Sequence, residues 1–339
     1  MTQSLNNDNP SITSGFATGS GRLLADVGGT HARFAWQAAA GEPLEHPRVL
    51  PVADHAGLED AVAAYLEGLK RPVAEAGIAI ATAVLGDAVR MTNHPWAFSQ
   101  QALKRRFGWS RLLVVNDFTA LALALPLVPP SELRPVGGGV AVPGTPLALL
   151  GPGTGLGVSG LVPDGRSGWL PLAGEGGHAT WNALSPREVL VREQLSQRFG
   201  HVSVERVACG QGLADVHAIL CAADGVTLSG KLLPRDVTEA ALVHGQPQAL
   251  ETLNLFAATL GTFAGDLALT LGARGGVYLG GGILPRMADW FVQHSPFRER
   301  FEAKGRYAGY LASIPVWIIT ADPSPALLGA GCALDSAPT

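Results

Sequence analysis

The sequence predicts an α/β protein of two domains. Its 339 residues exceed the roughly 100–200 residues of one domain, and 47% hydrophobic residues can form a substantial core. Strand-like and helix-like segments alternate, which is typical of α/β proteins with parallel strands. An apolar strand followed by a Gly/Thr turn occurs at 23–30 and again at 148–155. Both domains are therefore expected to open with the same β-hairpin, although two unrelated glycine-rich turns would fit the pattern equally well.

The elements of the first domain follow in order. Residues 22–27 have a buried-strand pattern that ends in Gly28-Gly29-Thr30, and 31–37 continue as extended chain. Apolar residues recur at nearly helical spacing over 57–69. Two strand-like runs, 78–84 and 112–115, precede an Ala/Leu-rich helix over 118–125 that Pro126 stops. A Pro/Gly-rich tract at 126–146 then indicates a domain boundary near residue 127.

The second domain shows the same alternation. Its first strand begins at residue 147 and runs into the glycine-rich segment 151–158. Further strands are predicted at 277–279 and 315–319. Helices are predicted at 186–199, 212–222, 237–244 and 248–271, and a last one begins within 325–332.

Composition excludes several classes of protein. The net charge of −4 leaves no basic surface for a nucleic-acid backbone. Three cysteines without CxxC spacing exclude a disulfide framework and a Cys-rich zinc site, and they fit a reducing compartment. The sequence contains no uninterrupted run of about 18 apolar residues, so no membrane span is predicted. Residues 1–20 lack the basic and apolar regions of a signal peptide, so they are expected to be a disordered leader.

The glycine-rich turns are candidate phosphate sites, although neither is a P-loop. No Lys follows the glycines at 151–157, and Leu156 occupies the place of the third Gly of a GxGxxG motif. Phosphate would instead be held between two hairpin turns, beside Asp26. One carboxylate is chemically sensible there, because Mg²⁺ keeps several waters and takes few protein ligands. A plain strand-to-turn junction is the alternative.

Four further polar positions are candidates for chemistry. Asp117 follows a strand and precedes a helix, so it is either a routine N-cap or a base that accepts a hydroxyl proton. Glu175 and His178 lie in a segment with three glycines, and both can bind vicinal hydroxyls. A metal site is not expected there, because no further ligand lies at a supporting spacing. Glu205 taken alone is typical of a surface residue.

Eight motifs in sequence order resemble the bacterial glucokinase family, within the actin/hexokinase/Hsp70 ATPase superfamily. The resemblance covers about residues 22–332. Sugar kinases with a CxCGxxGC zinc motif are excluded, because the three cysteines of this chain cannot form that motif. The motifs are LLADVGGTHARFAW (23–36), MTNHPWAFS (91–99), VVNDFTALALALP (114–126), LLGPGTGLGVSGLV (149–162), LAGEGGHATW (172–181), GHVSVERVACGQGL (200–213), GGVYLGGGILPR (275–286) and FEAKGRYAGYLASIPV (301–316).

The resemblance implies a two-domain ribonuclease H-like fold of the actin/hexokinase type with an inter-domain cleft. Residues 21–127 plus 322–339 would form the smaller domain and 128–321 the larger. The implied activity is transfer of the γ-phosphoryl of MgATP to the 6-hydroxyl of glucose. A cytoplasmic homodimer that binds neither nucleic acid nor membrane is also implied.

The resemblance also assigns roles to residues. Asp117 would be the catalytic base, and Asp26 would hold Mg²⁺ through water together with the ATP phosphates. The implied hexose ligands are Asn116, Asp117, Glu175, His178 and Glu205. The implied nucleotide contacts are Ala25, Asp26, Val27, Gly28, Gly29 and Thr30 in the first phosphate loop, Gly153, Thr154 and Gly155 in the second, and Gly280, Gly281 and Gly282 at the adenosine.

Three positions depart from the family pattern. His31 replaces the usual Asn after GGT, which puts the phosphate contacts in question. Cys209 and Gln211 replace Ser and Pro of an SGPG turn, which puts the geometry near Glu205 in question. The alternative functions are a kinase of mannose or an N-acetylhexosamine and a non-catalytic hexose sensor. Against a sensor, the chain has no output module beyond the family domain.

Overall fold

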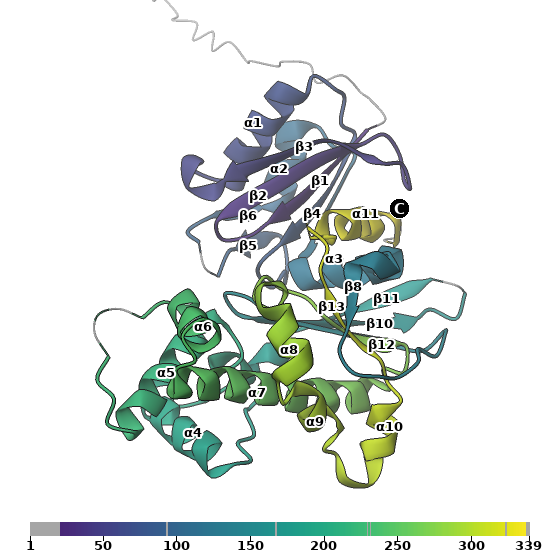
Figure 1. Ribbon diagram of the computed structural model, residues 1–339. Helices are drawn as coiled ribbons and strands as arrows, with labels where there is room; N and C mark the ends of the chain where they lie inside the picture. Colours follow the sequence, from purple (N-terminus) through teal and green to yellow (C-terminus); the bar gives the residue numbers. More distant parts are fainter. Residues whose placement is uncertain are drawn as a thin grey trace, which may run out of the picture.

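The computed structural model describes residues 21–92, 94–166, 168–228, 230, 232–322 and 324–336. The predicted disordered leader at 1–20 lies outside the described residues. Figure 1 shows two α/β bodies, each with its own sheet, and two helices, α3 (Asp117–Ala124) and α11 (Ala326–Ser336), between them. This arrangement agrees with the α/β class that the sequence predicts.

The first sheet has five strands. β1 pairs antiparallel with β2 and parallel with β4, and β4 pairs parallel with β7. In spatial order the strands are β3 (Leu44–Pro51), β2 (His31–Gln37), β1 (Arg22–Val27), β4 (Glu75–Ile80) and β7 (Arg111–Asn116).

The second sheet has six strands. Five of them repeat the sequence of antiparallel and parallel pairings found in the first sheet. β9 pairs antiparallel with β10 and parallel with β12, which pairs parallel with β13. In spatial order the strands are β11 (Trp169–Gly174), β10 (Leu156–Pro163), β9 (Leu147–Pro152), β12 (Gly276–Leu279), β13 (Val316–Ile319) and β8 (Leu133–Pro135).

The repeated hairpin predicted from the sequence is confirmed. β1 and β2 flank the turn at Gly28–Thr30, and β9 and β10 flank the turn at 153–155. The first hairpin opens its sheet, and only the short edge strand β8 precedes the second hairpin in its sheet; in both, a parallel strand joins the far side of the hairpin's first strand. The two unrelated turns considered as the alternative are therefore excluded.

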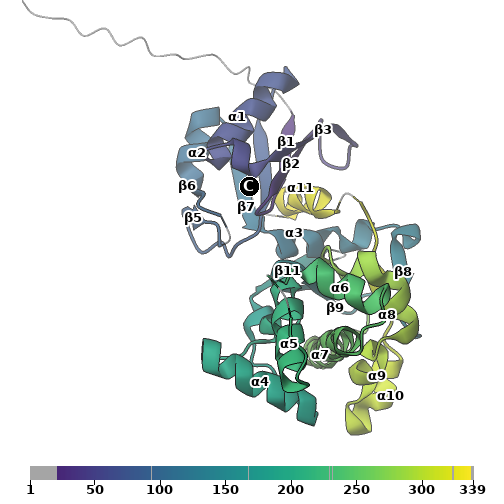
Figure 2. The same ribbon diagram turned by 60° about the vertical axis from the view of Figure 1, so that its left-hand side comes forward.

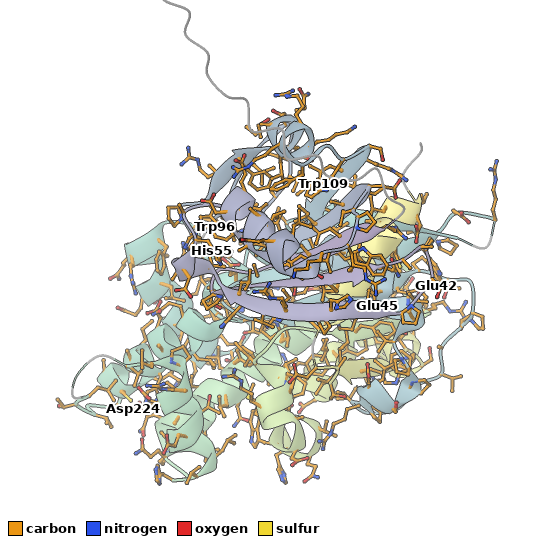
Figure 3. All side chains as sticks on the ribbon, turned by 90° about the horizontal axis from the view of Figure 1, so that it is seen from above. Glu42, Glu45, His55, Trp96, Trp109 and Asp224 are labelled. Atoms are coloured by element: carbon orange, nitrogen blue, oxygen red, sulfur yellow. The ribbon has the colours of Figure 1, made fainter. Side chains whose placement is uncertain are left out.

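Helices cover the first sheet on both faces. α1 (Leu58–Leu69) and α2 (Gln100–Phe107) lie on one side, and α3 and α11 lie on the other (Figure 2). A short ribbon of β5 (Ala88–Arg90) and β6 (Ala97–Ser99) follows β4. The buried indole of Trp96 joins this region to the start of α1, because its N–H donates to the His55 carbonyl at 3.1 Å (Figure 3).

The other helices belong to the second body. The predicted helix at 186–199 is confirmed residue for residue as α4, with a Ser185–Glu188 capping box at its start. Three short helices near the carboxyl end of the chain were not predicted. The helices are α4 (Pro186–Phe199), α5 (Gly210–Ala223), α6 (Pro234–Leu242), α7 (Pro247–Leu271), α8 (Ala288–His294), α9 (Phe297–Glu302) and α10 (Ala308–Ala312).

α7 is long and apolar enough to cross a membrane by length and composition, but 72% of its apolar window is buried inside the fold. Its hydrophobicity is that of a core helix. The remaining described helices do not meet the length and composition of a span.

α3 and α11 pack so closely that glycine is required between them. A Cβ at Gly329 would lie 1.7 Å from the Ala120 carbonyl oxygen, and a Cβ at Gly77 would lie 2.5 Å from that of Ala330. α11 is thereby fixed against β4, which supports placing the carboxyl-terminal segment with the first body. The division into 21–127 plus 322–339 and 128–321 stays a prediction.

Candidate active site

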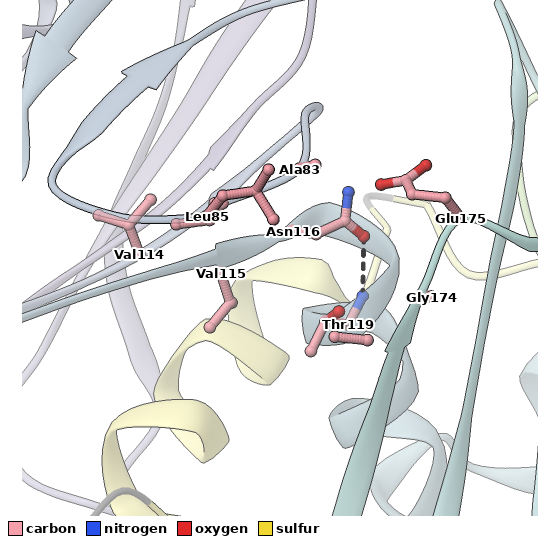
Figure 4. A pocket seen from close by; sticks show the side chains of 10 residues that line it. Ala83, Leu85, Val114, Val115, Asn116, Thr119, Gly174 and Glu175 are labelled. Carbon is pink, nitrogen blue, oxygen red and sulfur yellow. Dashed lines mark hydrogen bonds between the residues drawn. The ribbon is translucent and has the colours of Figure 1, made fainter.

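A pocket of about 220 Å³ lies between the two sheets. Its walls come from the loop after β4, from the end of β7 with the start of α3, and from the end of β11. Figure 4 shows Asn116 and Glu175 at this pocket. Two of the predicted hexose ligands therefore reach one cavity from different sheets. The lining residues are Ala83, Val84, Leu85, Val114, Val115, Asn116, Thr119, Ala173, Gly174 and Glu175.

The loop after β4 corrects the predicted strand at 78–84. β4 ends at Ile80 because its neighbours end at the same level, where Ile80 pairs with Val27 on one side and Asn116 on the other. The N–H of Thr82 then donates to the Ile80 carbonyl at 2.8 Å, which turns the chain out of the sheet. Residues 83–85 consequently line the pocket instead of extending the strand.

Asn116 is the cap of α3. Its Oδ1 accepts the N–H groups of Phe118 at 2.9 Å and Thr119 at 3.2 Å, and its Nδ2 donates to the Thr82 carbonyl at 3.3 Å. The interpretation of Asp117 as the N-cap is wrong, because Asp117 already occupies the first helical position. Asp117 is thereby free of the routine capping role.

Asp117 lies where β7 ends and α3 begins, and its Oδ1 accepts the N–H of Phe118 at 2.9 Å. Burial raises the pKa of the Asp117 carboxyl to about 7, and the negative charges of Asp26 and Glu175 add to this rise. A carboxyl group with a pKa near neutrality is suited to accept a proton at neutral pH. Asp117 is therefore influenced by one carboxylate from its own sheet and one from the other sheet.

Asp26 is the last but one residue of β1, beside the Gly28–Thr30 turn, and is only 7% exposed. Its Oδ2 lies 3.3 Å from the Arg33 guanidinium, from the residue directly opposite on β2. Burial raises the pKa of Asp26, and the charge of Arg33 opposes this. Sequence reasoning missed Arg33; the cross-strand register of the hairpin is the signal that pairs it with Asp26.

The other residues of the predicted first phosphate loop differ in which of their groups can contact a ligand. Ala25 and Val27 are buried in the strand, so only their backbone can face a ligand. The N–H of Gly28 donates to the His31 carbonyl at 2.9 Å, which closes the turn. His31 itself is exposed, with Nδ1 3.1 Å from the Thr30 hydroxyl. The replacement of Asn by His is thus accommodated at the rim of the turn.

The second turn and the 280–282 segment lie against each other. The N–H of Gly280 donates to the Leu150 carbonyl at 2.9 Å, and a Cβ at Gly151 would lie 2.6 Å from the Gly280 carbonyl carbon. Gly281 has a φ of +81°, and a Cβ there would meet the Pro152 carbonyl at 2.3 Å. The predicted phosphate and adenosine segments therefore form one continuous backbone surface.

Glu205 lies at this surface and not on the exterior. Its Oε2 accepts the N–H of Leu156 at 2.8 Å, directly after the second turn, and its Oε1 is 3.9 Å from His178 Nδ1. Backbone hydrogen bonds from Val204 to Ala179 and from Trp181 to Val202 pair the two segments. The interpretation of Glu205 as a surface residue is wrong, because this pairing carries it inward beside His178.

Glu175 and His178 are both exposed in the cleft. The glycines between them allow a close approach to β10: a Cβ at Gly177 would lie 2.1 Å from the Leu156 carbonyl oxygen, and one at Gly176 would lie 2.9 Å from Val158. The segment therefore has its composition because its backbone packs directly on the strand. Its two polar side chains are left facing solvent and any ligand.

The departures near Glu205 preserve its surroundings. Cys209 caps α5, because its Sγ accepts the N–H of Gly212 at 3.3 Å, as a serine hydroxyl would. The Gln211 amide donates to Asp215 at 2.9 Å on the exposed side of the same turn. The N–H of Gly210 donates to the Gly153 carbonyl at 2.9 Å, which fixes the second turn against α5.

Comparisons with known proteins identify the family. Residues 23–337 match the family model described as glucokinase. The chain is 53% identical to the glucokinase of Chromobacterium violaceum over 309 residues, which cover 91% of this chain and 87% of that protein. It is 51% identical to the glucokinase of Aromatoleum aromaticum over 320 residues, covering 93% and 95%.

Solved structures give the same result for the fold. Glucokinase from an Antarctic psychrotroph has a TM-score of 0.83 and 34% identity, with 94% of this chain and 99% of that chain covered. A ROK family glucokinase from Streptomyces griseus, in complex with glucose and AMPPNP, has a TM-score of 0.60 and 20% identity, covering 93% and 98%. The expected actin/hexokinase-type fold is confirmed.

Proposed function

The chain belongs to the glucokinase family, and on that premise we propose that Asp117 is the general base of its reaction. The protein transfers the γ-phosphoryl group of ATP to the 6-hydroxyl of D-glucose, giving glucose 6-phosphate and ADP. The observation that carries the assignment is the position of Asp117 directly after Asn116, which lines the pocket between the sheets, together with the rise of the Asp117 pKa to about 7 that burial causes.

The chemical step needs one proton acceptor. As O6 of glucose bonds to the γ-phosphorus, the hydroxyl proton passes to the Asp117 carboxylate, and the bond to the oxygen bridging the β- and γ-phosphorus breaks to release ADP. The bond from the Phe118 N–H holds one carboxylate oxygen in place. Asn116 caps the same helix, so the base and one hexose ligand share a single rigid element.

The hexose would be held by groups from both sides of the pocket. Asn116 comes from the first sheet, and Glu175, His178 and Glu205 come from the second body. Carboxylates and an imidazole offer acceptors and a donor for neighbouring hydroxyls. Because unpaired buried polar groups penalise a substrate that lacks a hydroxyl, such a set favours one hexose over its analogues.

The nucleotide would lie along the backbone surface formed by the two turns and the 280–282 segment. Successive backbone N–H groups in glycine-rich turns attract anions. The N–H groups of Gly153 and Leu156 are used within the protein, so Thr154 and Gly155 are the proposed phosphate contacts of the second turn. The N–H of Gly28 is likewise used within its turn, so Gly29 and Thr30 would face them from the first.

Mg²⁺ fits the site as a shared ion. Among the described residues, no group of three or more His, Cys, Asp and Glu side chains could hold a metal ion by itself. Asp26 would therefore hold Mg²⁺ through water, with the phosphates of ATP as the other ligands. When bound, the ion neutralises charge on the phosphates. Burial raises the pKa of Asp117 and the negative charge of the buried Asp26 raises it further, and this charge supports a cation at this place.

Two further properties are proposed on the family resemblance, namely that the chain forms a homodimer and that it acts in the cytoplasm. The net charge of −4 and the three free cysteines are in keeping with the second.

ADP formation with and without glucose tests the proposed function. The protein should form ADP and glucose 6-phosphate in a one-to-one ratio, and ADP formation should fall to a trace without a hexose. Equal ADP formation in both conditions would indicate an ATPase, and none in either would indicate a sensor. The same assay with mannose and N-acetylglucosamine in place of glucose tests the alternative substrates.

A further inference from the structure

The backbone of Leu156 joins three segments that are far apart in the chain. Its N–H donates to Glu205 Oε2 at 2.8 Å, and its carbonyl oxygen lies where a Cβ at Gly177 would stand. Leu156 begins β10 directly after the second phosphate turn. The nucleotide turn, the Glu175–His178 segment and the Glu205 loop therefore meet at one residue, Leu156, through the two peptide groups on either side of its Cα.

Glu205 can reach the N–H of Leu156 only because residue 155 is glycine. A Cβ at Gly155 would lie 2.4 Å from Glu205 Oε2 and 3.2 Å from its carboxyl carbon, and its three nearest atoms all belong to this carboxyl group. The φ angle of Gly155 is not in the left-handed region. An alanine is therefore compatible with the backbone at 155, and its methyl group would displace the carboxylate alone.

The two oxygens of the Glu205 carboxyl face different partners. Oε2 is held by the nucleotide turn, and Oε1 is 3.9 Å from His178. Only a quarter of the Glu205 side chain is exposed, whereas 61% of His178 is. Moving Oε2 off Leu156 would turn Oε1 away from the hexose side as well, because both belong to one planar group.

We propose that Gly155, a residue of the nucleotide turn, is a positioning residue for the hexose, because its missing side chain lets Glu205 lie against Leu156 with one oxygen directed to the sugar. The inference rests on the proposed function, since it takes Glu205 as a hexose ligand. According to this proposal, the residue at position 155 determines glucose affinity even when no nucleotide is bound. Gly155 would thus serve both substrates.

The test is calorimetric glucose binding to the full-length protein without nucleotide. Gly155→Ala should weaken glucose binding roughly 10- to 100-fold, the loss of about one hydrogen bond to a charged group. Gly153→Ala is the matched control in the same turn, because a Cβ there meets nothing within 4 Å and its φ is not positive. Its glucose affinity should stay within about twofold of the parent, whatever it does to ATP. Circular dichroism verifies that each variant is folded.

A double-mutant cycle separates this role from distortion of the turn. In a Glu205→Ala background, Gly155→Ala should have almost no further effect on glucose binding, because the carboxylate that it displaces is gone. Effects that simply add would overturn the proposal, as would unchanged glucose affinity in Gly155→Ala alone. If the parent protein itself does not bind glucose, the proposed function fails together with this inference; if the parent binds and Gly155→Ala binds equally, only the inference fails.

Glu205→Ala alone gives a second test that does not depend on how Gly155→Ala folds. Because Leu156 would lose its acceptor, the KM for ATP should rise several-fold in addition to the KM for glucose. An unchanged KM for ATP would show that the turn does not need Glu205, and the link between the two sites would be absent.

Discussion

Asp26 lies in β1 and Asp117 directly follows β7, two strands of the same sheet with β4 between them. Burial makes a charge costly at both carboxyls; Arg33 offsets only part of that cost at Asp26, and the charge of Asp26 adds to it at Asp117. The proposed reaction uses both consequences. Asp117 becomes a stronger base than an ordinary carboxylate, and the place beside Asp26 becomes favourable for a cation.

The raised pKa of Asp117 predicts the pH dependence of the reaction. With a pKa of about 7, the carboxyl is protonated below neutrality and cannot accept the hydroxyl proton. The kcat/KM for glucose should therefore fall about tenfold for each pH unit below 7 and level off above about 8. A profile that stays flat down to pH 5.5 would contradict the assignment of Asp117 as the base.

Glu175→Gln should act on both substrate affinity and this profile. The variant removes an acceptor for the hexose, so the KM for glucose should rise far more than the KM for ATP. It also removes a charge that raises the pKa of Asp117, so the acid limb of the kcat profile should move to lower pH. Equal changes in both KM values, with an unmoved limb, would show that Glu175 only supports the local structure.

At the scale of elements, the packing of α3 against α11 holds the two bodies together. Gly329→Ala should destabilise the protein by about 1–3 kcal/mol, because the new methyl group would press on the Ala120 carbonyl inside the helix pair. Gly309→Ala in α10 is the control, because a Cβ there meets nothing within 4 Å. It should be neutral or stabilising by up to about 1 kcal/mol.

Denaturant unfolding of the two variants distinguishes these outcomes. A Gly329→Ala protein as stable as Gly309→Ala would mean that α3 and α11 separate without cost, and that the helix pair does not fix the two bodies.

Elements with local signals were predictable from the sequence. α4 was placed to the residue because Ser185, Pro186 and Glu188 mark its start and Gly200 follows its end. The predicted strand at 78–84 extends past the true end of β4 at Ile80. The end of β4 depends on where β1 and β7 stop pairing with it and not on its own residues. The short helices α8 to α10 were missed, since tertiary packing and not periodicity shapes segments of five to seven residues.

The candidate site divides in the same way. The motifs around Asp26, Asn116 and Asp117 identified polar residues at strand ends, where ligands of α/β proteins bind. Arg33 and the contact between Glu205 and Leu156 were not accessible, because the first depends on cross-strand register and the second joins residues 49 positions apart. The sequence alone leaves open whether Asp117 is the cap, since Asn116 and Asp117 are both good capping residues at adjacent positions.

For the whole molecule, two sheets with the same order of strand directions face each other across α3 and α11 (Figure 1). The proposed site needs both: the first body supplies Asp26, Asn116 and Asp117, and the second supplies the second turn and the carboxylates proposed to bind the hexose. A relative movement of the two bodies would therefore open or close the pocket.

The proposed homodimer is a separate property of the whole molecule. Sedimentation equilibrium should give a mass of twice 35.1 kDa at micromolar concentration. A mass of one chain at every concentration tested would show that the resemblance does not extend to assembly.

Asp117→Asn tests the central claim most directly, in one set of measurements of kcat, glucose binding and melting temperature. Asn keeps an acceptor for the Phe118 N–H but cannot take a proton, so kcat should fall on the order of 10²- to 10⁴-fold with glucose binding retained. The folded state holds the Asp117 proton more tightly than the unfolded state, so ionisation of this group lowers stability as pH rises from about 4 to 7. The melting temperature of Asp117→Asn should therefore equal or exceed that of the parent at pH 8, and this difference should shrink at pH 5. A variant that phosphorylates glucose within a few-fold of the parent rate would contradict the account.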